Sequence, residues 1–538
     1  MSNSSKRPWI NAVMIDCVRI TERYEYYRRL IPRLARWGAN MLFWHFTDDE
    51  GCALKLASHP ELSSRYALTR EETVRLIRLA ARHGIEVVPE VESLGHAKWI
   101  THLPQYEHLF EGSAGHFNAL CPSHPEGLAI VRDVLTEVAE VFPSPWLHVG
   151  LDEVQFGPCP RCKRRGLPEW RLFADHLQAV HEIVAGLGKR MVLWGDHLVK
   201  DRRIARRVPR EALVAHWDYF VQHPLAADHR GLLEMGFEAL ACPAAARVFT
   251  CILPDATNLA NLRDFARVAQ ANRRRGSLGM VTTVWCPERQ LGASTHLPMA
   301  LGLAWAADPK AEAQTVAEGF VRHEFGLARP AAVARALLTL HDVSPSLLRL
   351  RKVFIEDPAT HPDNEYYRMT AADVTDAEER RSAVAGAAKV LAAARPRVTQ
   401  HRAEFAMYLD AAAIFDETLS RFGMWQDVAL LDRLRQNMVR DGDLDEARNL
   451  AADVATILTG AAGGAGQSAQ RAERDWKRLR HAEDPRRKGC DGYVRQKAAL
   501  PGLLVRTAAA LSRLAAKATR VARTGRGELG LPKSISTL

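Results

Sequence analysis

The sequence predicts an α/β protein in which a (β/α)8 TIM barrel is followed by an all-helical C-terminal domain. Short apolar runs alternate with segments of helical periodicity up to about residue 306, and such runs disappear after about residue 310. Eight runs alternating with helices favour a closed parallel barrel over an open sheet, since no glycine-rich phosphate loop follows the first run. We therefore expect the barrel at 8–308, the helical domain at 309–526 and a disordered tail at 527–538.

The eight apolar runs are the expected barrel strands. Continuous apolar runs suit parallel strands that are buried on both faces. Helix signals lie between them: Thr69 and Glu72 form a capping box ahead of a helix that ends at Gly84. The expected strands are 12–16, 40–46, 85–91, 146–150, 191–194, 213–217, 237–241 and 280–285.

The C-terminal part is rich in Ala, Leu, Arg and Glu, which predicts helices. Clear helical segments are 371–395, 401–421 and 443–458. The glycine-rich stretch 461–468 is interpreted as a flexible connector between helices. Two roles are open for this domain, a cap on the barrel and the interface of a homodimer.

The bulk composition is that of a soluble globular protein, with 47% hydrophobic and 25% charged residues. The net charge of +10 comes from basic residues that are spread along the chain, so we expect no nucleic-acid partner. Nine cysteines at irregular spacing, several inside apolar runs, indicate reduced thiols. The N-terminus has no apolar core for a signal peptide, and no run of about 18 apolar residues exists. We expect a cytoplasmic protein that does not bind membranes.

The most informative stretch is residues 146–154, where an apolar run ends in two adjacent carboxylates, Asp152 and Glu153. Like charges repel and burial penalises both, so the pair costs stability unless a substrate or a shared proton uses it. Taken alone, the two residues favour the solvated start of a loop or a helix N-terminus, where acids suit the helix dipole. The ends of the other strands must therefore decide between these interpretations.

Seven of the eight runs end in polar or aromatic residues, and Trp194, Trp217 and Trp285 stand at three of these ends. The carboxyl ends of barrel strands carry the active site in this architecture. A tryptophan face suits the apolar face of a sugar ring, while carboxylates and histidines suit its hydroxyl groups. The pattern therefore predicts a sugar-binding site with acid–base chemistry.

Three motifs carry a family resemblance. His148-Val-Gly-Leu-Asp-Glu-Val154 resembles the His-x-Gly-x-Asp-Glu signature of glycoside hydrolase family 20, the β-N-acetylhexosaminidases. Residues 42–49 resemble that family's second-strand segment, and residues 88–96 resemble its Pro-Glu-Ile-Asp-x-Pro-Gly-His motif. The resemblance covers about residues 8–307. Within the family, the lack of a leading domain and the sequence Trp217-Asp218-Tyr219 are most similar to the hexosaminidase D type.

The resemblance implies an exo-acting retaining β-N-acetylhexosaminidase that hydrolyses terminal β-linked GlcNAc or GalNAc from an N-acetylhexosamine-containing glycoside. Glu153 would be the general acid and base, and Asp152 would orient the substrate's 2-acetamido group, which acts as the nucleophile. No cofactor is implied, and we expect no metal in this site. The residues expected to bind or support the substrate are His45, Asp48, His96, His148, Trp194, Asp196, Trp217, Tyr219, Trp285 and Glu288.

The sequence also departs from the family pattern. Asn11 stands where the family carries a first-strand arginine that grips sugar hydroxyls, and residues 241–247 lack the expected Tyr-x-Asp. Glu92 and Leu94 replace an aspartate and a proline of the third-strand motif. A glycan-binding barrel that is catalytically weak or inactive therefore stays open as an alternative.

Two metal hypotheses are weighed against these interpretations. His45, Asp48, His96, His148 and Asp152 would suit a metal-dependent barrel hydrolase, but no His-x-His follows the first strand. The pair Cys159 and Cys162 is half of a zinc knuckle, and no second Cys-x-x-Cys exists to complete four ligands. A reduced loop turn is favoured there, and zinc stays open.

Overall fold

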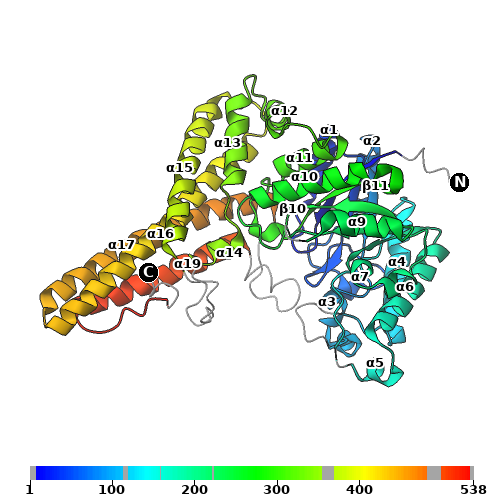
Figure 1. Ribbon diagram of the computed structural model, residues 1–538, viewed down its shortest axis with the longest axis horizontal. Helices are drawn as coiled ribbons and strands as arrows, with labels where there is room; N and C mark the ends of the chain where they lie inside the picture. Colours follow the sequence, from blue (N-terminus) through cyan, green and yellow to red (C-terminus); the bar gives the residue numbers. More distant parts are fainter. Residues whose placement is uncertain are drawn as a thin grey trace.

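The structure of the protein, a computed structural model, describes residues 8–112, 119–157, 159–220, 223–353, 369–481 and 499–532. The chain folds into a β/α barrel from which a bundle of long helices projects (Figure 1). The predicted fold class, a parallel barrel followed by a helical C-terminal region, is confirmed.

The barrel is a closed parallel sheet. Its strands follow each other in chain order, and the first strand pairs with both the second and the last. All eight predicted strands are present: β1 (Ile10–Asp16), β2 (Met41–His45), β5 (Glu86–Glu90), β6 (Trp146–His148), β7 (Arg190–Trp194), β8 (Leu213–Trp217), β9 (Glu238–Cys242) and β11 (Ser277–Val284). A short strand, β10 (Ala244–Ala246), also pairs with β11, and β3 (Thr47–Asp48) with β4 (Gly51–Cys52) forms a hairpin directly after β2.

Both faces of the barrel strands are buried, which explains why the runs are apolar throughout. In β1, Ala12 and Met14 point into the barrel interior, where they pack with residues of the other strands. Val13 and Ile15 point outward and pack beneath the surrounding helices. A parallel strand between an inner and an outer core has no polar face.

Helices cover the outside of the barrel. The capping box is confirmed: Thr69 Oγ1 accepts the Glu72 N–H at 3.2 Å, and the Glu72 side chain accepts the Thr69 N–H at 2.9 Å. The helices up to the end of the barrel are α1 (Tyr24–Arg36), α2 (Arg70–Arg82), α3 (Lys98–Thr101), α4 (Pro125–Val141), α5 (Pro160–Arg165), α6 (Glu169–Gly186), α7 (Asp196–Lys200), α8 (Arg202–Ala205), α9 (Leu225–Glu234), α10 (Ala256–Ala271) and α11 (His296–Ala307).

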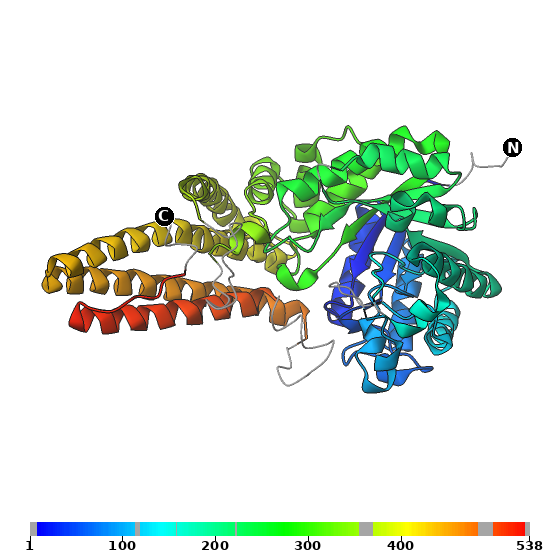
Figure 2. The ribbon, with the colours of Figure 1, turned by 60° about the horizontal axis from the view of Figure 1, so that its bottom comes forward.

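Three long helices form the arm that projects from the barrel, and they lie side by side in Figure 2. They are α16 (Arg402–Asp441), α17 (Leu444–Leu479) and α19 (Leu500–Thr524). Shorter helices link the arm to the barrel: α12 (Ala313–Phe325), α13 (Ala331–Asp342), α14 (Leu347–Leu350) and α15 (Ala371–Ala394). In the described part of the chain, no helix is long and apolar enough to cross a membrane.

The predicted connector at 461–468 is wrong, because α17 continues through it. One of its glycines serves helix packing instead: a Cβ at Gly464 would lie 3.0 Å from Glu417 Cγ on α16. Four residues further on, Ser468 Oγ donates to Glu417 Oε2 at 3.0 Å. Tertiary packing of α17 against α16 therefore outweighs the low helix propensity of glycine.

Part of the predicted tail is packed. Leu529 is buried, and the Gly527 carbonyl accepts a hydrogen bond of 3.0 Å from Arg435 Nη1 on α16. Residues 533–538 lie outside the described residues.

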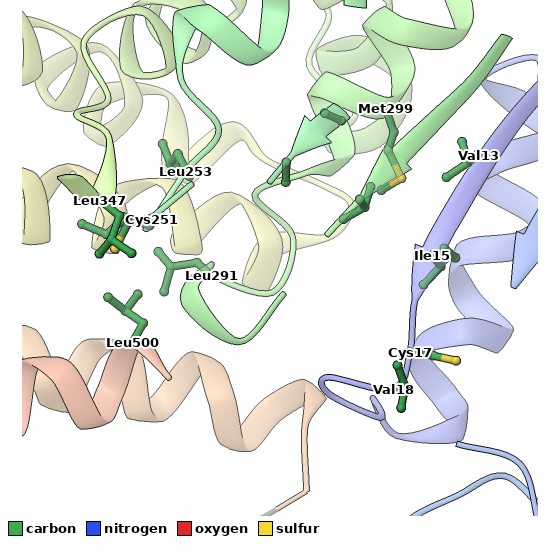
Figure 3. Close-up of a cluster of buried hydrophobic side chains, with 14 of the residues drawn as sticks. Val13, Ile15, Cys17, Val18, Cys251, Leu253, Leu291, Met299, Leu347 and Leu500 are labelled. Carbon is green, nitrogen blue, oxygen red and sulfur yellow. The ribbon is translucent and has the colours of Figure 1, made fainter. Parts of the chain in front are cut away.

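The helical part meets the barrel beside the carboxyl ends of the strands. Figure 3 shows Leu347 of α14 and Leu500 of α19 gathered around Cys251 and Leu291 of the barrel loops. A buried ion pair of 3.0 Å joins Arg480, at the end of α17, to Glu22 after β1. This docking places α14 and α19 at the rim of the barrel.

The contact between the strands that close the barrel predicts one position where a substitution should destabilise the fold. A Cβ at Gly279 of β11 would lie 2.0 Å from the Ile10 carbonyl oxygen on the neighbouring β1, so Gly279→Ala forces the closing strands apart. We expect a loss of about 1–3 kcal/mol in unfolding free energy, measured from the midpoint of chemical unfolding. The control is Gly319→Ala in α12, where nothing lies within 4 Å of the new Cβ. This control should be neutral or slightly stabilising, and equal destabilisation of both variants would contradict the packing argument.

Candidate active site

The carboxyl ends of the strands surround a cavity of about 530 Å³, within the size range of small-ligand sites. Ten of the twelve predicted site residues line it, together with side chains that the sequence analysis did not single out. The ten are His45, Asp48, His96, Asp152, Glu153, Trp194, Trp217, Tyr219, Trp285 and Glu288.

The other two predicted residues, His148 and Asp196, lie behind the cavity lining. The buried ring of His148 packs 4.5 Å from that of Trp194, and its Nδ1 accepts the Gly150 N–H at 3.1 Å. Asp196 Oδ2 accepts the Glu153 N–H at 3.3 Å. Both residues therefore support the turn that carries the paired carboxylates.

That turn has an unusual backbone. Gly150, Leu151 and Glu153 all have positive φ angles, of 65°, 76° and 49°. A Cβ at Gly150 would lie 2.0 Å from the Glu92 carboxyl oxygen Oε2, so only glycine fits. Positive φ at non-glycine residues stores strain and is concentrated at functional sites. The turn gives the adjacent acids different surroundings: the Asp152 side chain is 14% exposed and that of Glu153 is 32% exposed.

The Asp152 carboxylate forms a hydrogen bond with the carboxyl group of Glu92 beneath it. Burial, together with the charges of Asp196 and Glu153, raises the pKa of Asp152 to about 7, although His96 opposes this. Burial and the neighbouring Asp152 raise the pKa of Glu92 well above its usual value. Glu92 therefore keeps its proton and donates it to Asp152, while its Oε2 accepts the Leu151 N–H at 3.3 Å.

Arg19 supplies positive charge to the acidic side of the cavity. Its guanidinium contacts Asp16 at 2.9 Å, Asp48 at 2.8 Å and Glu50 at 3.5 Å. Burial alone would raise the pKa of Asp48, but Arg19 and His96 hold it well below its usual value. Asp48 is therefore ionised at neutral pH.

Two histidines lie on either side of Asp48. His45 Nε2 lies 2.9 Å from Asp48 Oδ2, and its Nδ1 contacts the buried Glu90. Burial lowers the pKa of His45, but Glu90 and Asp48 outweigh that effect and raise it to about 10. His96 Nδ1 lies 3.1 Å from Asp48 Oδ1, and its Nε2 lies 3.3 Å from Glu153 Oε2.

Both histidines are therefore cations at neutral pH. The pKa of His96 is raised well above its usual value, because Asp48 and Asp152 outweigh its burial. A charged imidazole has two N–H donors and no lone pair for a metal ion. The donor set around His45 and His96 thus fits hydrogen bonding to carboxylates better than metal ligation, although their carboxylate partners lie close enough to hold an ion.

Aromatic side chains also form part of the cavity wall. Trp194 and Trp285 lie 5.9 Å apart, and Trp217 stacks on Tyr219 at 5.1 Å. Trp285 Nε1 donates to the Tyr219 hydroxyl at 2.8 Å. The indole N–H groups of Trp194 and Trp217 are buried and have no hydrogen-bond partner within the described chain. These rings offer apolar faces and two N–H donors to a ligand.

Asn11 plays no part in this cavity. Its Nδ2 donates to the Gly38 and Leu303 carbonyls, at 3.1 and 3.0 Å, and it is absent from the cavity lining. Position along the chain could have found Arg19, since it follows the end of β1 by three residues. The helical part also lines the cavity, through Leu347, Arg351 and Leu503. No local pattern in the sequence signals those three residues, because only long-range docking brings them to the barrel.

Comparison with known proteins identifies the barrel. Residues 10–273 match the family model "Glycosyl hydrolase family 20, catalytic domain". The barrel belongs to glycosyl hydrolase family 20. The chain is 33% identical to a β-hexosaminidase of Vibrio furnissii over 234 residues, which make up 35% of this chain and 38% of that protein. It is 28% identical to human hexosaminidase D over 222 residues, 38% of this chain and 44% of that protein.

The match is confined to part of each relative, so this chain spans less than half the length of these two curated proteins. Among solved structures, it is similar to a family 20 exo-β-N-acetylglucosaminidase of Vibrio harveyi in complex with N-acetylglucosamine. That likeness has a TM-score of 0.48 at 23% identity, covering 57% of this chain and 55% of the other. The predicted membership of family 20 is confirmed.

The charge network of the family 20 barrel predicts a pH-dependent effect of Arg19→Met. Removing the cation leaves Asp16 and Asp48 buried without it, and breaking such a pair costs about 3–5 kcal/mol. The stabilisation that a low folded-state pKa of Asp48 provides is present above about pH 4 and is lost as the pH falls further. The difference in unfolding free energy between variant and wild type should therefore stay wide from pH 7 down to about pH 4 and narrow as the pH falls below about 4.

The measurement is the free energy of unfolding of both proteins across that pH range. Arg28→Met, which breaks the exposed Arg28–Glu25 pair, is the control and should change little at any pH. If the difference in unfolding free energy between Arg19→Met and wild type does not depend on pH, the low pKa assigned to Asp48 is contradicted.

Proposed function

We propose that the barrel is an exo-acting, retaining β-N-acetylhexosaminidase that cleaves terminal β-linked GlcNAc or GalNAc. The observation that carries the proposal is the pair Asp152 and Glu153, held by a strained turn in a cavity walled by tryptophans. Membership of family 20 and relatives named β-hexosaminidase support the same activity.

In the first step the substrate's own 2-acetamido oxygen attacks the anomeric carbon. The glycosidic C–O bond breaks as Glu153 protonates the departing oxygen, and the sugar closes into a cyclic oxazolinium intermediate. Asp152 accepts the acetamido N–H and stabilises the positive charge that develops on this group. His96 Nε2, 3.3 Å from Glu153 Oε2, fixes the position of the acid.

In the second step Glu153, now ionised, takes a proton from water as the water oxygen attacks the anomeric carbon. The ring C–O bond to the acetamido oxygen breaks, the acetamido group is restored, and Glu153 is protonated again. Two displacements at one carbon retain its configuration. The roles of the two acids differ, which fits their different exposures.

The remaining cavity residues suit the recognition of one N-acetylated sugar. Trp194, Trp217 and Trp285 would enclose the acetamido methyl group and the apolar face of the ring. Glu288 is buried with both carboxylate oxygens lacking a hydrogen-bond partner in the described structure, so sugar hydroxyls would supply donors. Asp48, with its two histidines, would hold the acid pair in place from the other side.

The cellular compartment of the enzyme is proposed from the reduced state of its cysteines. The eight cysteines in the described ranges form no disulfide, which supports a reducing compartment such as the cytoplasm. A homodimer through the helical domain stays one of the two open predictions for that domain, and the molar mass in solution would test it.

The first test is turnover of aryl β-N-acetylglucosaminide and β-N-acetylgalactosaminide by wild type and two isosteric variants. Asp152→Asn should lose about a hundredfold or more in kcat on every substrate, because it removes the charge that faces the acetamido group. Glu153→Gln should lose about a hundredfold to ten-thousandfold on a disaccharide, whose poor leaving group needs protonation, and less on an activated aryl glycoside.

Glu182→Gln, an exposed carboxyl on α6, is the matched control and should retain full activity. A thiazoline that mimics the oxazoline should inhibit the wild type. Full activity in both active-site variants would refute the assignment of the acid pair, whereas sugar binding without turnover by the wild type would favour a binding barrel.

The shared proton leads to a separate prediction for Glu92→Gln. Because Glu92 is already neutral, an amide can still donate to Asp152 and accept the Leu151 N–H, so kcat should stay within about threefold of wild type. The same isosteric change at Asp152 should be severe. Equal losses in Glu92→Gln and Asp152→Asn would mean that Glu92 works as an anion.

A further inference from the structure

Three cysteines and one glutamate converge outside the catalytic cavity. Cys121 Sγ lies 3.4 Å from Cys159 Sγ and 3.7 Å from Cys162 Sγ, and Cys162 Sγ lies 3.2 Å from Glu111 Oε2. One potential ligand atom from each of the four lies within 4.8 Å of the others. We call this cluster the Cys3Glu tetrad.

The tetrad joins two loops of the barrel. Glu111 and Cys121 belong to the segment between β5 and α4, while Cys159 precedes α5 and Cys162 lies within it. All four residues are buried, and the apolar side chains of Phe156 and Leu172 pack around the sulfur atoms. Water therefore has little access to the cluster.

The Glu111 carboxyl has no cationic partner in the described ranges of the chain. Glu111 Oε1 is buried without a hydrogen-bond partner, and in the described ranges no Lys or Arg forms an ion pair with this carboxyl. A buried carboxylate and three thiolates can coexist at neutral pH only beside a cation that compensates their charge.

The spacing matches a tetrahedral ion. Zn–S bonds of about 2.3 Å imply S···S edges of about 3.8 Å, and a carboxylate bond of about 2.0–2.2 Å implies a slightly shorter S···O edge. The separations in the tetrad, 3.4, 3.7 and 3.2 Å, lie close to these edges. They are far from the S–S bond of about 2.05 Å in a disulfide.

We propose that Glu111, Cys121, Cys159 and Cys162 bind one structural zinc ion. Three soft sulfur ligands select zinc over magnesium or calcium, and four protein ligands leave no open position for catalysis. The thiols release their protons to solvent on binding, so the site carries three thiolates and one carboxylate around the ion.

The ion would fasten the loop of the catalytic acids to its neighbour. Cys159 follows Glu153 by six residues, and the segment that supplies Glu111 and Cys121 also carries His96. His96 and Glu153 already meet at 3.3 Å at the cavity end of these two loops. Zinc at the other end would hold both loops in register, and this inference does not depend on which glycoside the barrel cleaves.

The test is the metal content and metal geometry of the full chain. Protein expressed with zinc in the medium and then dialysed should contain about one zinc per chain by elemental mass spectrometry. X-ray absorption at the zinc edge should show three sulfur atoms at about 2.3 Å and one oxygen at about 2.0–2.2 Å. A chain without bound zinc, a shell of nitrogen and oxygen only, or a Cys121–Cys159 disulfide found by peptide mass spectrometry would each overturn the proposal.

Variants locate the site on the chain. Cys162→Ser and Glu111→Gln should each lower zinc affinity at least about tenfold, because each removes one ligand. Cys251→Ser, at a buried cysteine outside the tetrad, should keep one zinc per chain. Unchanged zinc affinity in Cys162→Ser would also overturn the proposal. Neither readout uses turnover, so a failed zinc site and a failed hexosaminidase assignment can be told apart.

Discussion

The active site depends on the charge balance around Asp48. This buried carboxylate contacts the three cations Arg19, His45 and His96, which neutralise the acids at the ends of β1, β2 and β5. Burying like charges so close together is unfavourable unless cations or protons compensate them. Burial and the neighbouring carboxylates nevertheless hold the pKa of Glu92 well above its usual value and raise the pKa of Asp152 to about 7. The raised pKa of Glu92 favours its protonated form, which can donate a hydrogen bond to Asp152.

Closure of the barrel brings these charges together. Asp16, Asp48 and Asp152 are far apart in the sequence, yet they lie at or just after the ends of β1, β2 and β6, which are parallel strands of one sheet. The carboxyl ends of parallel strands meet at a single rim, so residues that follow different strands share one cavity. The Gly279–Ile10 contact at the closing pair of strands is therefore a condition for the site, although it lies outside the cavity.

The barrel and most of the cavity residues could be predicted because their signals are local. A strand buried on both faces is apolar throughout, and a residue at a strand end is known once the strand is known. Arg19 could be predicted in the same way, because it lies three residues after the end of β1. The connector at 461–468 was wrong because the packing of Gly464 against Glu417 decides the helix, and one segment read alone cannot show its neighbour. The docking of α14 and α19 brings Leu347, Arg351 and Leu503 to the cavity. No periodic pattern of apolar residues in the sequence signals this docking.

The same reasoning explains why only half of the tetrad could be predicted from the sequence. Cys159 and Cys162 stand at a recognisable spacing, whereas Cys121 and Glu111 come from another loop and share no motif with them. The strained turn that carries Asp152 and Glu153 also needs contacts from a neighbouring loop to hold its conformation. β6 is only three residues long, and the turn after it holds two non-glycine residues at positive φ, each costing about 1–3 kcal/mol. Such strain persists only where the surroundings fix the chain from several sides, as Glu92, His148 and Asp196 do near Asp152. Beyond Glu153, the Val154 N–H donates to His197 Nε2 at 3.0 Å, and the Cys3Glu tetrad holds the same loop again at Cys159 and Cys162.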